Sequence, residues 1–517
     1  MPGTWSNTTS HRLPDMPKGP LETGPQEQGN NSPAGGHVII TDKEQRAVRA
    51  LFTRTVFHKL AGIIRLSLRG RFLTQVQMGD MLLINNWISY TIGFQAGTSN
   101  AFGFLYPGAV DSGNEREAES LATVARFGML FGALLSTVSI WFACRLVLDD
   151  PVLIGLFTAY ASLYLPKSFA DKWLRSRRAF EKLARIEMTG QTISLALSVP
   201  LIIYFQLVGL LIALIAGRLT VVLLTPDSWR LTRLPKWPEL RRSVVFGFRI
   251  TVTGISQTFY VTATFQAFAY FNRGDTASLG NLAFAFTLVD LVRSGIEAVA
   301  SVQGVESRSQ ISRFHTRNQN KLIDTLNLFA TTDLIIASFG IMILMAVFIP
   351  ALPLAFPKYT GSLAYMPGLF LWTLVHISHR YHNNHVKACG SVVKLCTSLG
   401  LATGFIFAGV ALLVHYEAPL PLFTLPPLAA ALLINLVLSR LSAQSMSFPG
   451  NWWRDYLARM AILIINLPLF AAPFIPLWSV ALILPLCFLL TCLYSHRVHP
   501  RALARFIVLL TFWRKGK

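Results

Sequence analysis

Runs of about 20 apolar residues recur from about residue 55 to residue 496, separated by short polar segments. A helix of that length crosses a hydrocarbon layer about 30 Å thick, so the pattern predicts an all-α polytopic membrane protein. We expect about fourteen transmembrane helices, at 54–74, 80–107, 122–147, 151–170, 188–206, 207–225, 244–270, 279–303, 325–349, 362–384, 392–415, 421–440, 457–475 and 476–496.

Composition and charge agree with this interpretation. The chain is 52% hydrophobic and 14% charged, whereas soluble domains contain about 25% charged residues. Its net charge of +21 arises largely from every second loop, around 167–185, 230–242, 308–321 and 497–505, and the alternate loops hold little beyond Arg273 and Lys358. The positive-inside rule assigns the basic loops to the cytoplasm, which places both termini there.

The N-terminal segment differs from the rest of the chain. Residues 1 to about 40 are rich in Pro, Gly, Ser and Asn and poor in apolar residues, a composition typical of disorder. They show no basic region followed by an apolar core and a cleavage site, so no signal peptide is predicted.

The first predicted helix carries charge at a depth where lipid is expected. It contains Lys59, Arg65 and Arg69, which an amphipathic helix lying in the interface would explain. We favour a true span whose basic face lines a hydrated cavity, because Arg65 and Arg69 share a helical face with His58. Removing this crossing would also place the basic residues before it on the wrong side of the membrane.

Charged residues also occur in later predicted spans, where they are costly unless they face a cavity or a partner. Asp290, Arg293 and Glu297 share one helical face by their spacing. They form either a neutralising ion pair that fixes packing, or a site where Arg293 meets an anionic ligand and a carboxylate handles a coupling cation. Asp333 and Arg218 are open to the same two interpretations.

Two predicted spans carry polar stripes at helical period. The stripe in 244–270 contains Arg249, Thr253, Ser256, Gln257, Tyr260 and Thr264, and the one in 80–107 contains Asn86, Ser89, Tyr90, Gly97 and Asn100. Small hydroxyl residues also join helices together, but stripes this long favour the lining of a hydrated cavity. Hydroxyls and amides suit sugars, and guanidinium groups suit phosphate oxygens.

Two segments resemble a known family. Residues 78–121 contain a Gly-Asp start, a long apolar segment, the motif GTSNA, a proline and the turn SGNEREA, and residues 164–215 contain a basic loop between apolar spans. Both are similar to the oligosaccharide-flippase branch of the MOP superfamily, and the similarity extends over residues 50–500. The chain departs from the family pattern in its N-terminal tail and its unusually basic first span.

The resemblance implies two six-helix lobes around a central cavity, plus two C-terminal helices. The implied division is a disordered cytoplasmic tail at 1–50, an N-lobe at 51–225, an inter-lobe loop at 226–243, a C-lobe at 244–440, extra spans at 441–496 and a basic tail at 497–517. It also implies a bacterial or archaeal cytoplasmic membrane.

The function implied is the translocation of a polyprenyl-diphosphate-linked oligosaccharide, or polysaccharide export, by alternating access. Its anionic headgroup would contact Lys59, Arg65, Arg69, Arg218, Arg249 and Arg293. Glycosyltransferases or a polysaccharide polymerase are expected partners besides the lipid bilayer, and no cofactor or nucleic acid is expected. The alternatives are an ion-coupled multidrug antiporter of the same superfamily, using Asp290 or Asp333, and a non-transporting scaffold for polysaccharide assembly.

Four histidines recur at a three-residue spacing, at His376, His379, His382 and His385. Steps of three rotate around a helix, so only neighbouring pairs could share a metal ion, and no carboxylate completes a ligand set. We expect no metal site, and interpret His382 and His385, with Arg177 and Arg178, as a cytoplasmic gate facing lipid headgroups or cargo phosphate. The sequence contains no Walker, HExxH or GxSxG motif, so a non-enzymatic protein is expected.

Overall fold

The structure, a computed structural model, describes residues 42–272 apart from residue 232, together with 277–290, 293, 319–378, 380–388, 392–445, 452–468 and 477–512. These residues form helices joined by turns, and no strand occurs among them. The fold class predicted from the apolar pattern, an all-helical polytopic membrane protein, agrees with this architecture.

The first half of the chain contains α1 (Asp42–Phe72), α2 (Gln75–Tyr90), η1 (Thr91–Gln95), α3 (Thr98–Asp111), α4 (Glu115–Arg145), α5 (Pro151–Ser162), α6 (Tyr164–Ser176), α7 (Phe180–Leu223), η2 (Pro226–Ser228) and α8 (Trp237–Phe271). The second half contains the helix Ala277–Asp290, α10 (Gln319–Ala355), η3 (Pro357–Ala364), α11 (Met366–Ser378), α12 (Arg380–Ala388), α13 (Val392–His415), η4 (Leu420–Thr424), α14 (Leu425–Ser445), α15 (Trp452–Ile465), α16 (Leu477–Val498) and α17 (Pro500–Phe512).

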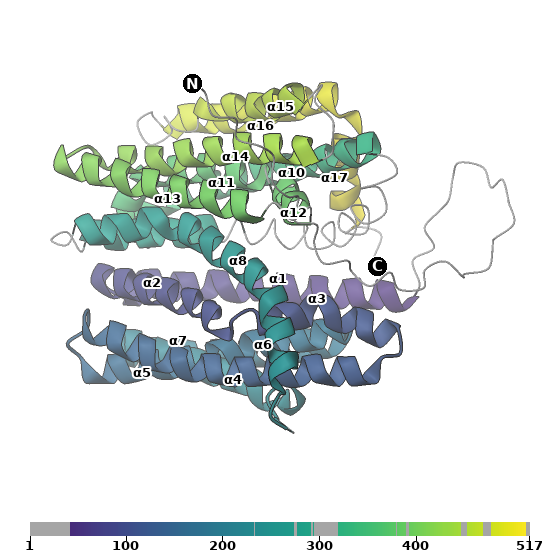
Figure 1. Cartoon of the computed structure of the whole chain (residues 1–517). Coiled ribbons are helices and arrows are strands. Elements are labelled where there is room, and N and C mark those ends of the chain that lie inside the picture. Colours follow the sequence, from purple (N-terminus) through teal and green to yellow (C-terminus); the bar gives the residue numbers. More distant parts are fainter. Residues whose placement is uncertain are drawn as a thin grey trace, which may run out of the picture. The chain divides into compact units, whose positions relative to one another are not determined.

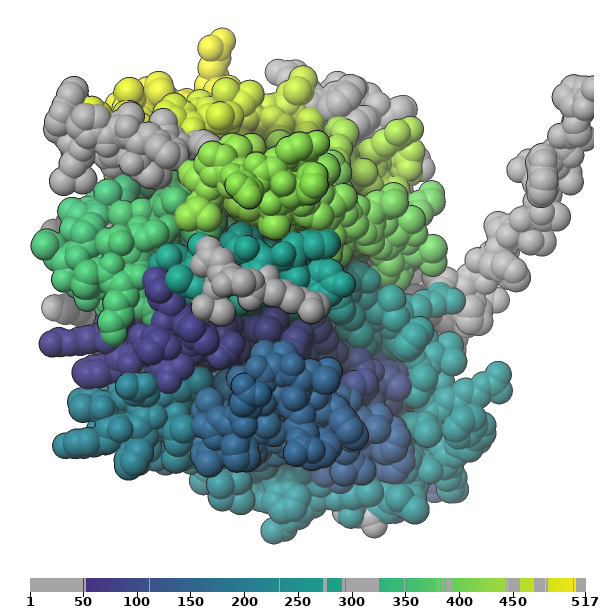
Figure 2. Space-filling model, turned by 90° about the vertical axis from the view of Figure 1, so that its left-hand side faces the viewer, coloured from purple at the N-terminus to yellow at the C-terminus, as the bar shows by residue number. Residues whose placement is uncertain are grey.

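Helices α1–α7 form a first bundle and the helices after α8 form a second bundle (Figure 1). Helix α8 contacts α2, α3 and α4 of the first bundle and α13 and α14 of the second. On the face drawn in Figure 2, residues of α1 and α2 (purple) lie between blue residues of the first bundle and teal-to-green residues of the chain from α8 onward. The largest hydrophobic core among the described residues lies mainly in the second bundle. It includes the C-terminal half of α8 and also Leu66 of α1 and Met78 and Leu83 of α2.

Six helices in the described part of the chain are long and apolar enough to cross a membrane. They are Glu115–Arg145, Pro151–Ser176, Phe180–Leu223, Thr325–Val347, Val392–His415 and Leu420–Ser442. Shorter apolar helices occur at Ala277–Asp290, Met366–Ser378, Tyr456–Ile465 and Leu482–Val498. The protein is therefore a multi-pass membrane protein, and the count of fourteen spans stays a prediction.

The predicted span at 80–107 is broken in the structure. Helix α2 ends at Tyr90, a 3-10 turn follows, and Ala96 (φ 47°) and Gly97 (φ 85°) adopt left-handed backbone before α3 begins. A Cβ on Gly97 would lie 2.2 Å from the carbonyl carbon of Gly247 in α8. The break therefore allows the backbones of the two segments to touch, which no other residue permits.

The two predicted spans at 188–206 and 207–225 form one hairpin within α7. Gln206 has non-helical backbone (φ 47°, ψ −121°). A Cβ on Gly209 would lie 2.0 Å from the carbonyl oxygen of Leu201, and one on Gly190 would lie 2.8 Å from that of Gly217. These contacts require the two halves to run back along each other.

Two features lie outside the predicted spans. In the loop between the bundles, Arg233 donates two 3.1 Å hydrogen bonds to the Glu239 carboxylate, and this bonding lowers the pKa of Glu239. At the end of the chain, where a basic tail was expected, α17 packs Ala502 and Phe506 against Ile335 of α10.

Candidate functional site

Basic side chains of α1 and α6 meet a buried carboxylate of α7. Glu187 of α7 is 4% exposed and accepts hydrogen bonds from Arg54 of α1 and from Lys167 of α6, the latter at 2.8 Å. Arg54 also lies 3.6 Å from Asp171, which pairs with Arg175 at 3.0 Å. This network joins three helices of the first bundle.

Further along α1, two arginines meet the interior of the first bundle. Arg65 donates a hydrogen bond to the side-chain oxygen of Gln191 on α7. Arg65 and Arg69 lie near each other and near Tyr160 of α5. Arg218, on the second half of α7, donates a 2.9 Å hydrogen bond to the carbonyl of Tyr160 and lies 3.4 Å above its ring.

These basic residues form what we call the cationic cluster: Arg54, Arg65, Arg69, Lys167 and Arg218. The buried Nε atoms of Arg65 and Arg69 have no hydrogen-bond partner among the described residues. Buried donors are almost always bonded, and an unbonded one costs about 1–3 kcal/mol. The cluster therefore has donor capacity left for an anionic group.

The structure brings together three of the six predicted headgroup residues, namely Arg65, Arg69 and Arg218. Lys59 follows His58 on α1 and contributes to its electrostatic environment. Arg249 is exposed on α8, and Arg293 lies 3.2 Å from Asp290. The predicted set is therefore divided between the two halves of the chain.

Sequence reasoning missed four members of the site, Arg54, Lys167, Glu187 and Tyr160. The two basic residues were assigned to the cytoplasmic ends of spans, where such residues are common. Glu187 carried one available signal, because it is an acidic residue at the start of a predicted span among basic neighbours. Tyr160 had no distinguishing pattern, since it sits in an ordinary apolar run.

The predicted polar stripe of 80–107 contributes one bridging residue. Asn100 of α3 donates a 2.7 Å hydrogen bond to Thr251 of α8 and accepts one of 2.8 Å from Lys172 of α6. Asn86 is half-buried, and its backbone carbonyl accepts a 2.6 Å hydrogen bond from Ser89. The side-chain amide of Asn100, which was expected to line a cavity, thus joins α3, α6 and α8 by hydrogen bonds.

The stripe on α8 faces partly into the second bundle. Gln257 accepts a 3.4 Å hydrogen bond from Asn383 of α12, and Ser256 is half-buried. Tyr260 is 1% exposed, and its ring centre lies 6.3 Å from that of His376 on α11. Tyr260 is therefore a core residue in this conformation, whereas Ser256 and Gln257 retain some exposure.

The residues proposed for ion coupling have different environments. Asp290 is exposed and forms the i,i+3 ion pair with Arg293, which was one of the two expectations for this helix. Asp333 of α10 is fully buried. Glu297 lies outside the described residues.

The predicted cytoplasmic gate has two dissimilar halves. Arg177 donates a 3.3 Å hydrogen bond to Tyr106 and its guanidinium lies 4.3 Å above the ring of Trp173, while Arg178 is exposed with φ 57°. His382 and His385 are 5% and 0% exposed.

The two histidines bond inside the second bundle. His382 bonds to Arg459 of α15, and His385 lies 3.0 Å from the hydroxyl of Ser442 on α14. The expectation that they face headgroups or cargo therefore differs from the structure, because α12 turns this face toward α14 and α15. No group of three or more His, Cys, Asp or Glu side chains that could hold a metal ion occurs among the described residues.

The two bundles also meet at the end of α1. The Tyr359 hydroxyl of η3 donates hydrogen bonds of 3.2 Å to the carbonyls of Leu73 and Thr74. Gln75 donates to the carbonyl of Lys358 and, at 3.4 Å, to Asn281. This set of contacts holds the α1–α2 turn against the second bundle.

Comparison with known proteins rests on structure alone, since no family model and no curated protein matches the sequence. An inward-facing multidrug-resistance MATE transporter of the MOP superfamily covers 78% of this chain and all of its own, at 13% identity and a TM-score of 0.58. A mutant of the Vibrio cholerae MATE transporter VcmN covers 80% of this chain and all of its own, at 14% identity and a TM-score of 0.54.

The lipid II flippase MurJ in an inward closed conformation covers 86% of this chain and 99% of its own, at 16% identity and a TM-score of 0.57. The chain shares its fold with these MATE transporters and with MurJ. The resemblance inferred from residues 78–121 and 164–215 is confirmed at this level. Two of these proteins are named as transporters and one as a flippase.

Proposed function

We propose that the protein translocates a polyprenyl-diphosphate-linked oligosaccharide across a bacterial or archaeal cytoplasmic membrane by alternating access. The observation that carries this proposal is the cationic cluster, in which the Nε atoms of Arg65 and Arg69 are buried and unbonded. A diphosphate offers several anionic oxygens, and guanidinium groups bind such oxygens through paired charge-assisted hydrogen bonds.

The balance of charge distinguishes this substrate from a cationic drug. The cationic cluster contains five basic residues. The two carboxylates nearest to it, Glu187 and Asp171, already form ion pairs with members of the cluster, so its net charge is positive. An organic cation entering this region would meet net repulsion, whereas a diphosphate would meet attraction. The multidrug antiporter is therefore the second candidate, supported by the MATE fold but not by the charge of the cluster.

In this proposal, amides and hydroxyls of the two polar stripes contact the sugars of the cargo. Asn86 and Ser256 are half-buried, and Asn100 and Gln257 bond across helix boundaries. Such groups exchange hydrogen bonds readily with sugar hydroxyls. In the predicted orientation, the contacts of Tyr359 with Leu73 and Thr74 join the two bundles at the outer side.

The energy source and the partners complete the proposal. The membrane potential acting on an anionic cargo supplies driving force, about 2.3 kcal/mol per charge at 100 mV. Asp290, Glu297 and Asp333 are the candidate residues for coupling a cation. Glycosyltransferases or a polymerase are the partners that would supply and consume the lipid-linked glycan. A non-transporting scaffold is the remaining alternative.

The test measures binding and translocation of a polyprenyl-diphosphate oligosaccharide by purified protein in liposomes. Arg65→Ala and Arg69→Ala each remove a charged donor, worth about 1.5–3 kcal/mol, so we expect about ten- to hundredfold weaker binding and lost translocation. Arg145→Ala is the matched control, because Arg145 is an exposed arginine of the same bundle that stacks 5.0 Å above Trp141.

Three results would overturn the proposal. Unchanged binding by both cluster variants would remove the cationic cluster as the headgroup site. Proton- or sodium-driven accumulation of an organic cation, without glycan transfer, would establish the multidrug alternative. Absence of any transported cargo, with assembly enzymes retained on the protein, would establish the scaffold.

A further inference from the structure

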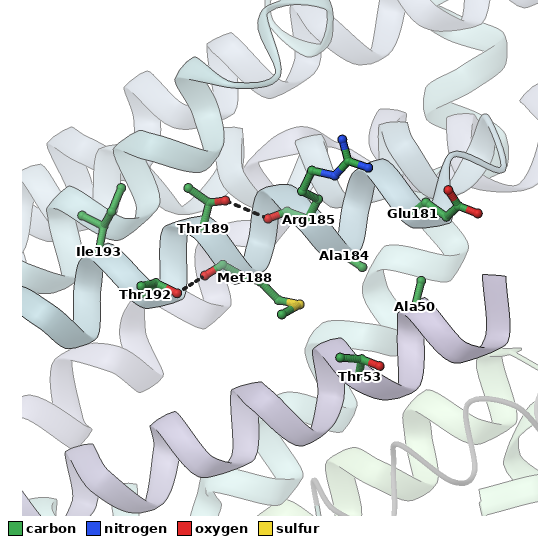
Figure 3. A pocket seen from close by; sticks show the side chains of 9 residues that line it. All are labelled: Ala50, Thr53, Glu181, Ala184, Arg185, Met188, Thr189, Thr192 and Ile193. Atoms are coloured by element: carbon green, nitrogen blue, oxygen red, sulfur yellow. Dashed lines mark hydrogen bonds between the residues drawn. The ribbon is translucent and has the colours of Figure 1, made fainter. Parts of the chain in front are cut away.

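A crevice of about 590 Å³ lies between the start of α1 and the first half of α7 (Figure 3). The α1 side contributes Ala50 and Thr53, and the α7 side contributes Glu181, Ala184, Arg185, Met188, Thr189, Thr192 and Ile193. None of the functional residues predicted from the sequence lines this crevice. It therefore requires a separate explanation.

Small side chains create the space. Ala50 and Thr53 stand opposite Ala184, and Met188 projects toward α1 beside them (Figure 3). The α7 residues that line the crevice extend from Glu181 to beyond Thr192, a length of about 18 Å at 1.5 Å per residue. An unbranched hydrocarbon chain fits a narrow crevice of this length, and methionine adapts to such chains readily.

The hydroxyl groups in the crevice do not make it a polar site. Thr189 donates a 3.0 Å hydrogen bond to the carbonyl of Arg185, and Thr192 donates one of 2.9 Å to the carbonyl of Met188. Both donors are satisfied within α7, so each threonine presents its methyl group or a weak acceptor to an occupant. The crevice therefore favours an apolar chain over a sugar or a polar solute.

Basic side chains surround one end of the crevice. Arg185 lines the crevice and is exposed, Lys182 is exposed one turn earlier, and Arg178 is exposed in the preceding loop. Glu181 is the single acidic residue in the lining. Basic residues at the end of an apolar groove complement a phosphate headgroup attached to a hydrocarbon chain.

We propose that this crevice binds one hydrocarbon chain of a membrane phospholipid with an anionic headgroup, whose phosphate contacts Lys182 and Arg185. The bound lipid would lie beside the Arg54–Glu187 ion pair, since Arg54 follows Thr53 and Glu187 precedes Met188. It would thereby hold α1 against α7 in the conformation described here. The crevice adjoins the cationic cluster but shares no lining residue with it, and its occupancy does not depend on which cargo the protein transports.

The experiment uses full-length protein in phosphatidylcholine nanodiscs with spin-labelled phosphatidylglycerol or spin-labelled phosphatidylcholine as the probe. The fraction of motionally restricted probe gives its relative association constant. We expect wild-type protein to prefer phosphatidylglycerol, and Ala184→Trp, which fills the crevice, to lose about one restricted lipid per protein. Ile203→Trp is the control, because Ile203 lies on the same helix with a 46% exposed side chain.

The headgroup contact has its own variants. Lys182→Ala and Arg185→Ala leave the crevice open, so a folding defect does not obscure the result, and each should reduce the preference about fivefold, or about 1 kcal/mol. Equal binding of both probes by wild type, or an unchanged restricted fraction in Ala184→Trp, would overturn the proposal. Arg65→Ala should keep wild-type lipid preference, so a failure of this site and a failure of the transport proposal give different results.

Discussion

Glu187 provides the sharpest test of how the first bundle is held together. Its carboxylate is 4% exposed and neutralises Arg54 of α1 and Lys167 of α6 at once. Glu187→Gln keeps the shape of the side chain and one acceptor oxygen but removes the negative charge. Both cations then face each other without their common counterion.

The expected loss of stability follows from the burial of Glu187, Arg54 and Lys167. Removing one partner of a buried ion pair costs about 3–5 kcal/mol, because the other charge stays desolvated. The Arg54 and Lys167 side chains keep 18% and 29% exposure, and water therefore recovers part of that cost. We expect a loss of about 2–3 kcal/mol in the free energy of unfolding.

The assay is thermal unfolding of the purified protein in detergent, followed by tryptophan fluorescence. For a chain of 517 residues, the expected loss corresponds to a fall of about 2–3 °C in the apparent melting temperature, because the entropy of unfolding grows with chain length. Glu181→Gln is the control, since this glutamate is exposed on the same helix and should change stability by less than about 0.5 kcal/mol.

A double variant isolates the ion pair itself. Lys167→Met combined with Glu187→Gln should cost about 1–2 kcal/mol less than the sum of the single changes, because the two side chains share one interaction. Two results would show that the network does not stabilise the bundle. One is a Glu187→Gln protein with the melting temperature of wild type, and the other is a double variant whose loss of free energy equals the sum of the two single losses.

Two further predictions concern the contacts between the bundles. Gly247→Ala adds a Cβ that would lie 2.0 Å from the carbonyl oxygen of Gly97. We therefore expect the free energy of unfolding to fall by about 3 kcal/mol or more, with poor recovery of folded protein. Gly254→Ala is the control and should be tolerated, because the space around its Cβ is open. Tyr359→Phe removes the hydroxyl that bonds η3 to the α1–α2 turn. It should favour the state in which these two segments are apart by about 1 kcal/mol. Spin labels on the two segments should then report a roughly fivefold larger population at the longer distance. Unchanged distance distributions would show that this contact does not control closure.

Apolar pattern alone predicted much of the helical architecture. The helix Val392–His415 has the bounds expected from its apolar run, and the hairpin in α7 reverses at Gln206, where one predicted span ended and the next began. The pattern could not predict the break at Ala96 and Gly97, because it depends on contact with a glycine 150 residues away in the chain. Hydrophobic periodicity reports burial and is insensitive to such close backbone approaches.

Only part of the candidate site could be predicted, because a sequence pattern along one helix does not show which other helices it contacts. The basic face of α1 was visible because Arg65 and Arg69 stand out in an apolar run, and the structure groups them with Arg218. Spacing along one helix gives no information on which other helix it meets. The same holds for His382 and His385, which were expected to face headgroups or cargo phosphate and are buried against α14 and α15 in this conformation.

Helix α8 connects the two bundles, because each of its halves is packed against a different one. Its N-terminal half touches the first bundle through the bare backbones of Gly97 and Gly247, and its C-terminal half belongs to the core of the second through Phe265 and Phe268. A side-chain bond reinforces this crossing, since Asn100 of α3 donates a 2.7 Å hydrogen bond to Thr251 of α8. Because both ends of α8 are held, we expect any rocking of one bundle against the other to bend this helix between its two attachments rather than to release either of them.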